Sequence, residues 1–126
     1  MPKNSSKYVS RGDEVQSIAV KSIEGKPTYG ESLHAKPLLM GEHLAFLEIR
    51  YAKGTGAPLH VHTHESIVYV VSGKLKTRIS DDEFVLEPGD ACLHPAGVSH
   101  TVEALEDSIM VEIKSPAPDI TKFFEW

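Results

Sequence analysis

The sequence has a single cysteine, no long apolar run and no excess of basic residues. Because Cys92 is alone, an intrachain disulfide and a cysteine-rich metal framework are both excluded. The longest uninterrupted apolar run, IVYVV at residues 67–71, is too short to span a bilayer, and the N-terminal residues contain no apolar core of signal-peptide length. These absences predict a soluble cytoplasmic protein with no membrane partner.

The charge balance argues against nucleic acid as a partner. Thirteen Lys and Arg against eighteen Asp and Glu give a formal net charge of -5, and the charges are scattered along the chain, so no basic face is available for a phosphate backbone. With 126 residues and 40% hydrophobic content, the chain can bury one core. We expect a flexible N-terminal arm over residues 1–12 and a single domain over residues 13–126.

Short β segments separated by turn residues make up most of the sequence. Breakers rich in Gly, Pro and Asp recur at roughly ten-residue spacing, which is typical of an all-β sandwich or barrel. Residues 119–126 predict a short terminal helix or an extended tail. The segments of strand length that are rich in β-branched or aromatic residues lie at 44–51, 66–71, 75–80, 83–86, 91–94, 100–105 and 108–114, with an eighth at 14–23.

Three histidines alternate with other residues in LHVHTHES, residues 59–66. Successive side chains of a strand point to opposite faces, so alternate imidazoles converge on one side. Neutral imidazole is the commonest protein ligand for divalent transition metals. His60 and His62 are therefore predicted to bind one metal ion, and a second histidine-bearing segment, HPAGVSH at 94–100, supports that prediction.

Two motifs between residues 54 and 104 resemble those of the cupin superfamily. The matching residues are Gly54, His60, His62 and Gly73 in the first motif and Gly89, Pro95, Gly97 and His100 in the second. The runs HVHTHESIVYVVSGKLK and HTVEALEDSIMVEIKSPAPD are similar to small single-domain cupins of the pectin-degradation and sugar-acid type. The resemblance implies a jelly-roll β-barrel in which His60, His62 and His100 hold one divalent transition metal, namely Fe, Mn, Ni or Zn.

The sequence departs from the cupin pattern at two positions. Ser66 stands where the family usually places its carboxylate ligand, and Ala104 stands where the second motif usually ends in Asn. A serine hydroxyl is a weak ligand, so Ser66, His64, His94 and water all remain candidates for the fourth ligand. Three neutral imidazoles leave a bound ion its full double charge, and the site should then attract anions.

Glu112 and His94 are the candidate catalytic residues. Glu112 lies among the alternating apolar residues Ile109, Val111 and Ile113, so it points to the opposite face of that strand. If that face is the cavity, Glu112 is a candidate general acid or base; otherwise it is an exposed strand carboxylate. His94 has the parity to face the cavity, where it could act in proton transfer, as a ligand, or simply as a buried histidine.

The resemblance leads to three hypotheses about function. The first is a small metalloenzyme of lyase or isomerase type that uses Lewis-acid catalysis on a small oxyanionic substrate, such as a sugar acid, enolate or dicarbonyl. The second is a three-histidine iron dioxygenase of diketones or thiols. The third is a non-catalytic cupin that binds or senses a small ligand. The family also favours a homodimer, for which the apolar face of Ile67, Tyr69 and Val71 is a candidate interface.

Overall fold

The computed structural model describes residues 7–119 and 124–125, and the strands within these ranges form three antiparallel sheets. In spatial order, the six-stranded sheet contains β1 (Ile18–Ala19), β4 (Leu33–Met40), β5 (Ala45–Tyr51), β12 (Ser108–Ser115), β7 (Glu65–Ser72) and β10 (Ala91–His94). The four-stranded sheet contains β6 (Gly56–His60), β11 (His100–Ala104), β8 (Leu75–Ile79) and β9 (Asp82–Leu86). The small third sheet contains β13 (Phe124–Glu125), β2 (Ser22–Ile23) and β3 (Lys26–Pro27).

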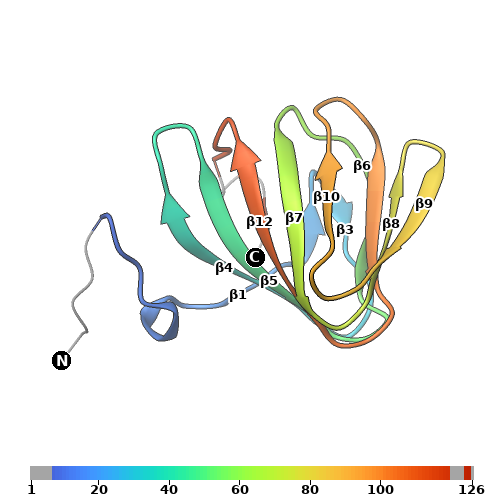
Figure 1. The fold of residues 1–126 in the computed structure, drawn as a ribbon, viewed down its shortest axis with the longest axis horizontal. Helices are drawn as coiled ribbons and strands as arrows, with labels where there is room; N and C mark the ends of the chain where they lie inside the picture. Colours follow the sequence, from blue (N-terminus) through green and yellow to red (C-terminus); the bar gives the residue numbers. More distant parts are fainter. Residues whose placement is uncertain (1–6, 120–123, 126) are drawn as a thin grey trace.

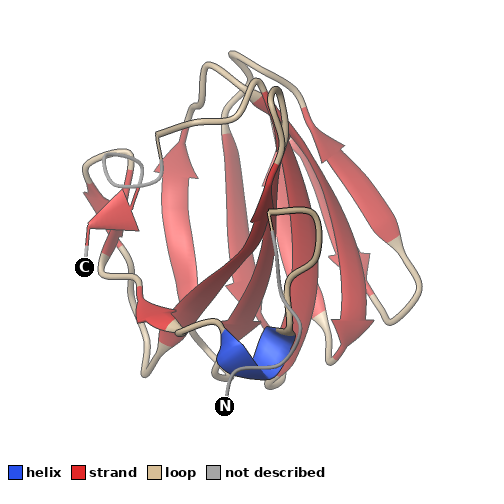
Figure 2. Ribbon diagram, turned by 90° about the vertical axis from the view of Figure 1, so that its left-hand side faces the viewer, coloured by secondary structure: helices blue, strands red, loops and turns tan. Residues whose placement is uncertain are grey.

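The two larger sheets face each other and enclose the core. In Figure 1, β4, β5, β12 and β7 run side by side, with β8 and β9 on the other side of the molecule. Figure 2 shows the strands of the two sheets on opposite sides of a common interior. Apolar side chains from both sheets fill that interior, including Leu47, Val68, Leu75, Val102 and Met110. The prediction of an all-β fold is confirmed.

The alternation of buried and exposed residues along the strands determines which side chains point into the interior. From His60 to Val70 every second side chain is buried, and those between them are exposed. Along β12 the same alternation buries Met110, Glu112 and Lys114. Strand register places Ser66 opposite both His94 and Lys114. One end of the interior is therefore polar, while the remainder is apolar.

The seven predicted strands from residue 44 onward all overlap observed strands, whereas the N-terminal half differs more. The predicted strand over 14–23 is instead broken into a 3-10 helix, Gly12–Glu14, followed by the short strands β1 and β2. The sequence reading also missed β4, because Lys36 and Pro37 interrupt its apolar pattern; β4 tolerates them by a register shift against β5 between Pro37 and Leu39.

The termini are described only in part. Residues 1–6 of the predicted arm lie outside the described residues, as do 120–123 and 126 of the predicted tail. Within that tail, Phe124–Glu125 is extended and pairs with Ser22–Ile23. Among the described residues, no helix has the length and apolar character needed to cross a membrane.

Candidate metal centre

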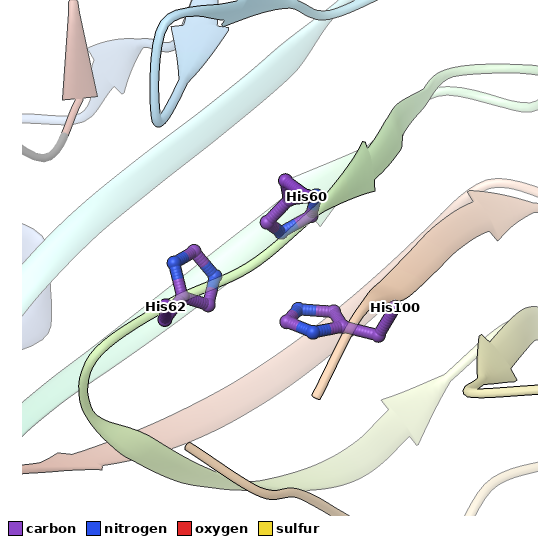
Figure 3. A group of neighbouring side chains, drawn as sticks. All are labelled: His60, His62 and His100. Atoms are coloured by element: carbon purple, nitrogen blue, oxygen red, sulfur yellow. The ribbon is translucent and has the colours of Figure 1, made fainter. Parts of the chain in front are cut away.

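Three buried histidines meet at the polar end of the interior. His60 is the last residue of β6, His62 follows in the next segment, and His100 is the first residue of β11. Strand pairing places His60 directly opposite His100. Each residue offers one ring nitrogen, and these nitrogens lie within 4.8 Å of one another. Figure 3 shows the three rings pointing toward one another, an arrangement that can share one metal ion.

Each of these rings has an oxygen acceptor facing its Nδ1. His60 Nδ1 lies 2.6 Å from the carbonyl of Pro58, and His100 Nδ1 lies 3.4 Å from the carbonyl of Val98. The Glu24 carboxylate lies 3.5 Å from His62 Nδ1, an ion-pair distance without a hydrogen bond. Carbonyl oxygens only accept, so the contacts of His60 and His100 favour the proton on Nδ1 and leave the lone pair on Nε2. The negative charge of Glu24 favours the same tautomer of His62. This pattern is the one that orients metal-binding histidines in proteins.

Burial keeps the three rings in the form that binds metal. Removal from water lowers the pKa of His60 and of His62 below the ordinary value, and lowers the pKa of His100 to about 3. For His62 the neighbouring Lys114 charge acts in the same direction. All three imidazoles are therefore neutral near pH 7, as metal ligation requires.

His94 joins the two sheets beside this cluster. It comes from β10, is 2% exposed and stacks on His100 with ring centroids 4.0 Å apart. Its Nε2 lies 2.9 Å from Oγ1 of Thr77, which donates its only proton to the carbonyl of Thr101. The hydroxyl must then accept from His94, so Nε2 carries the ring proton. Nδ1 of His94 is buried and has no hydrogen-bond partner among the described residues.

An ion pair from the opposite sheet completes the polar end. Lys114 is 1% exposed, and its Nζ lies 3.0 Å from Oε1 of Glu112 and 3.3 Å from Nε2 of His64. Burial alone would raise the pKa of Glu112, but the charge and hydrogen bond of Lys114 outweigh it, so the pKa falls below the ordinary value. Glu112 is therefore a carboxylate near pH 7.

These groups line one small cavity. Its volume is about 20 Å³, room for a single water-sized group. The polar wall is formed by His60, His62, His94, His100, Glu112 and Lys114. The apolar wall includes Val20, Ile23, Ile49, Val102 and Met110. The cavity thus places the three-histidine group from one side of the barrel opposite an acid and a cation from the other.

The sequence-predicted site residues reach this region in different ways. His94 and Glu112 line the cavity, so Glu112 is not the exposed strand carboxylate of the alternative interpretation. Ser66 is buried between His94 and Lys114 in the strand register. His64 is also buried and stacks on His62, but its Nε2 faces Lys114, and it lies outside the three-histidine group.

Sequence reasoning missed three residues of the site, namely Lys114, Thr77 and Glu24. Lys114 shares strand parity with Glu112, and that parity was the available signal. Thr77 alternates with Leu75 on β8, which gave a weaker signal. For Glu24 the sequence gave no signal, because its approach to His62 depends on how the N-terminal hairpin folds against the barrel.

Comparisons with known proteins agree with this architecture. The family model for the cupin domain matches residues 47–113. The structure of KdgF from Halomonas sp. is similar, with a TM-score of 0.67 and 29% identity, covering 70% of this chain and 82% of that one. An RmlC-like cupin from Shewanella frigidimarina has a TM-score of 0.75 and 25% identity, covering 91% of this chain and 96% of that one. These likenesses confirm the predicted jelly-roll fold.

A curated relative is the oxalate decarboxylase OxdC of Bacillus subtilis. It is 28% identical over 87 residues, which make up 65% of this chain and 23% of the relative. The chain therefore spans about a quarter of the length of this relative, which is a much larger protein.

Proposed function

Because the chain belongs to the cupin domain family, we propose that it is a metal-dependent enzyme of lyase or isomerase type that acts on a small oxyanionic molecule. The proposal takes residues 13–126 as one catalytic domain. His60, His62 and His100 would hold one divalent transition metal. The observation that carries the proposal is the convergence of three buried imidazoles, two of which are oriented by a contact from Nδ1 to a backbone carbonyl.

The charges around the cavity support an anionic substrate. The three-histidine group is neutral, so an ion held there keeps its full double charge. Lys114 adds a positive charge to the cavity wall, which the carboxylate of Glu112 offsets. The remaining positive potential favours a carboxylate or an enolate, and the cavity has room for one of its oxygen atoms. The name of the curated relative, an oxalate decarboxylase, supports small carboxylates as the first class to test.

The chain's own residues divide the chemistry between the two sheets. A bound divalent metal would supply Lewis-acid polarisation of substrate oxygens. Glu112, held as a carboxylate by Lys114, can take a proton from a carbon next to those oxygens and return it to another. His94 carries its proton on Nε2, so its Nδ1 can accept a hydrogen bond from a substrate hydroxyl. The apolar wall limits competing water.

A second candidate function is favoured by the composition of the three-histidine group. It contains no carboxylate, and the sequence resemblance to three-histidine iron dioxygenases rests on that feature. Iron in the same group would favour oxygen activation, whereas zinc would favour lyase or isomerase chemistry. The metal that the protein retains therefore discriminates between the two candidates.

The first experiment is elemental analysis of protein purified without an affinity tag or chelator, followed by turnover assays. About one Fe, Mn, Ni or Zn per chain supports the metal site. Sugar acids, oxalate and diketones are then tested, with oxygen consumption recorded. Conversion of an acid without oxygen uptake supports the lyase or isomerase, and oxygen uptake with a diketone supports the dioxygenase. Metal binding with tight ligand binding and no turnover would instead indicate a non-catalytic binding protein.

We also propose that the chain forms a homodimer through the outer face of β7. Ile67, Tyr69 and Val71 are each about half exposed, at 53%, 48% and 48%. Leu93 and Ile113 flank Ile67 in the strand register and are also exposed, so the patch is continuous across three strands. Light scattering should show a dimer that Ile67→Lys dissociates, whereas Val85→Lys on β9 should not change it. A monomeric wild type would refute the dimer.

A further inference from the structure

The turn between β2 and β3 holds a residue in an unfavourable backbone conformation. Ile23 pairs with Lys26, so Glu24 and Gly25 form a two-residue turn, with φ angles of +52° and +74°. Both central residues of such a turn need positive φ, which favours Gly, Asn or Asp. Gly25 suits its position, but Glu24 carries a Cβ and is strained there. Residues held in strained conformations cluster at functional sites.

The side chain of Glu24 reaches the metal centre. Its Oε1 lies 3.5 Å from Nδ1 of His62, whose side chain is 4% exposed, while that of Glu24 is 39% exposed. The same segment places Val20 and Ile23 in the cavity wall. The strained turn therefore does more than connect two strands, because it brings a carboxylate from the N-terminal hairpin against one of the three converging histidines.

His62 differs from its two neighbours in how its ring is held. Nδ1 of His60 and of His100 each face the backbone carbonyl of the residue two positions earlier, Pro58 and Val98. These contacts are local and persist whatever the side chains nearby. Nδ1 of His62 forms no such hydrogen bond within the described part of the chain, and the group that faces it at 3.5 Å is the carboxylate of Glu24, from a distant part of the sequence. A substitution can therefore remove it without altering any of the three histidines.

We propose that Glu24 is a positioning residue for the metal centre, which keeps the proton of His62 on Nδ1 and directs its Nε2 toward the ion. This inference rests on the proposed function, because it requires that His62 bind a metal. It adds that the N-terminal hairpin is part of the metal site, although it lies outside the residues that match the family model. Loss of such a supporting contact typically weakens metal binding about 10-fold to 100-fold.

Glu24→Gly is the decisive variant, because glycine adopts positive φ without strain and only the carboxylate is lost. We expect its Co²⁺ affinity, measured by competition with a chelator, to fall about 10-fold to 100-fold. The melting temperature of the metal-free variant should equal or exceed that of the wild type. Glu24→Gln keeps an acceptor oxygen and should bind Co²⁺ with intermediate affinity. Glu42→Gly, which removes an exposed glutamate outside the cavity wall, is the matched control.

Two further readouts separate positioning from a structural role. The visible spectrum of bound Co²⁺ should change in Glu24→Gly. ¹⁵N spectra of the metal-free protein should show neutral His62 with its proton on Nδ1 in the wild type and as a mixture of the two neutral tautomers in the variant. If Glu24→Gly binds Co²⁺ with the wild-type affinity, the inference about Glu24 fails, but the proposed function does not. A melting temperature that falls together with the affinity would overturn that inference in favour of a structural role. If the wild type takes up no Co²⁺, the proposed function and the inference both fail.

Discussion

The hydroxyl of Thr77 lies 2.9 Å from Nε2 of His94 and determines which ring nitrogen carries the proton. Because this hydroxyl donates to the Thr101 carbonyl, it can only accept from His94. The contact also links β8 of one sheet to β10 of the other. The cavity-facing chemistry of His94 therefore depends on a residue that makes no contact with substrate in the proposed mechanism.

Thr77→Val removes this acceptor while keeping the side-chain volume. We expect the free energy of unfolding to fall by about 1–3 kcal/mol, because buried His94 Nε2 and the Thr101 carbonyl both lose a partner. ¹⁵N spectra near pH 7 should show neutral His94 with its proton on Nε2 in the wild type and as a mixture of the two neutral tautomers in the variant. Thr101→Val is the control, since only the backbone of Thr101 takes part. An unchanged His94 spectrum would contradict the assigned tautomer.

His60→Ala or His100→Ala should abolish stable metal retention. Each substitution removes one of three converging nitrogens, and two imidazoles hold a divalent ion far more weakly than three. Elemental analysis after dialysis should find well under one ion per chain, against about one in the wild type. His43→Ala removes an exposed histidine outside the group and should retain the wild-type content. A full equivalent of metal in either site variant would show that the ligand assignment is wrong.

Removal of Lys114 alone from the buried Lys114–Glu112 pair should destabilise the protein more than replacement of both residues. Lys114→Met leaves a buried carboxylate without its cation, and the free energy of unfolding should fall by about 3–5 kcal/mol. The double variant Lys114→Met/Glu112→Leu replaces both charges with apolar groups and should recover most of that loss. Urea unfolding of the metal-free proteins gives both values. A double variant as unstable as the single one would show that the ion pair is not the source of the effect.

The metal-free protein should lose stability as the pH falls from 6.5 toward 4. Burial lowers the pKa of His64 and of His94 from 6.5 to about 4, so in this window the unfolded chain binds more protons than the folded one. His64 and His94 then each cost up to about 1.4 kcal/mol per pH unit until both states are protonated below pH 4, and the lowered pKa values of His62 and His100 add to the slope.

Measuring this dependence between pH 6.5 and 5 separates the histidines from Glu112. The pKa of Glu112 is already lowered from 4.5 in the folded protein, so its contribution to stability is lost only at pH values below that range. Urea unfolding of the wild type should show the slope, and His94→Leu should reduce it. An identical slope in that variant would show that His94 does not titrate as its burial implies.

The residues predicted from the sequence are those whose placement follows from local rules. Strand parity was enough to bring His60 and His62 to one face, and the second motif supplied His100. Lys114 follows the same parity as Glu112, but a lysine near a strand end is usually solvated. Its burial depends on the ion pair with Glu112, which the sequence pattern does not reveal. Parity therefore located the face of each residue without identifying its partner.

The residues that the sequence could not place depend on non-local packing. Whether Thr77 meets His94 depends on how two sheets close on each other, and whether Glu24 meets His62 depends on where an N-terminal hairpin docks. The strand β4 was missed for a different reason, because Pro37 is unfavourable in a strand and only the register shift against β5 reveals how it is accommodated. For Thr77 and Glu24 the missing information lay in contacts between separate segments of the sequence.

The unbroken alternation from His60 to Val70 makes the length of this segment as restricted as its composition. The residues between β6 and β7 continue the alternation of the strands on either side, so their number determines which side chains of β7 point into the interior. Deleting one residue there would turn Ser66, Val68 and Val70 toward solvent and Ile67, Tyr69 and Val71 toward the interior. A substitution in this segment can be absorbed one side chain at a time, but a change in its length would invert the whole strand that follows.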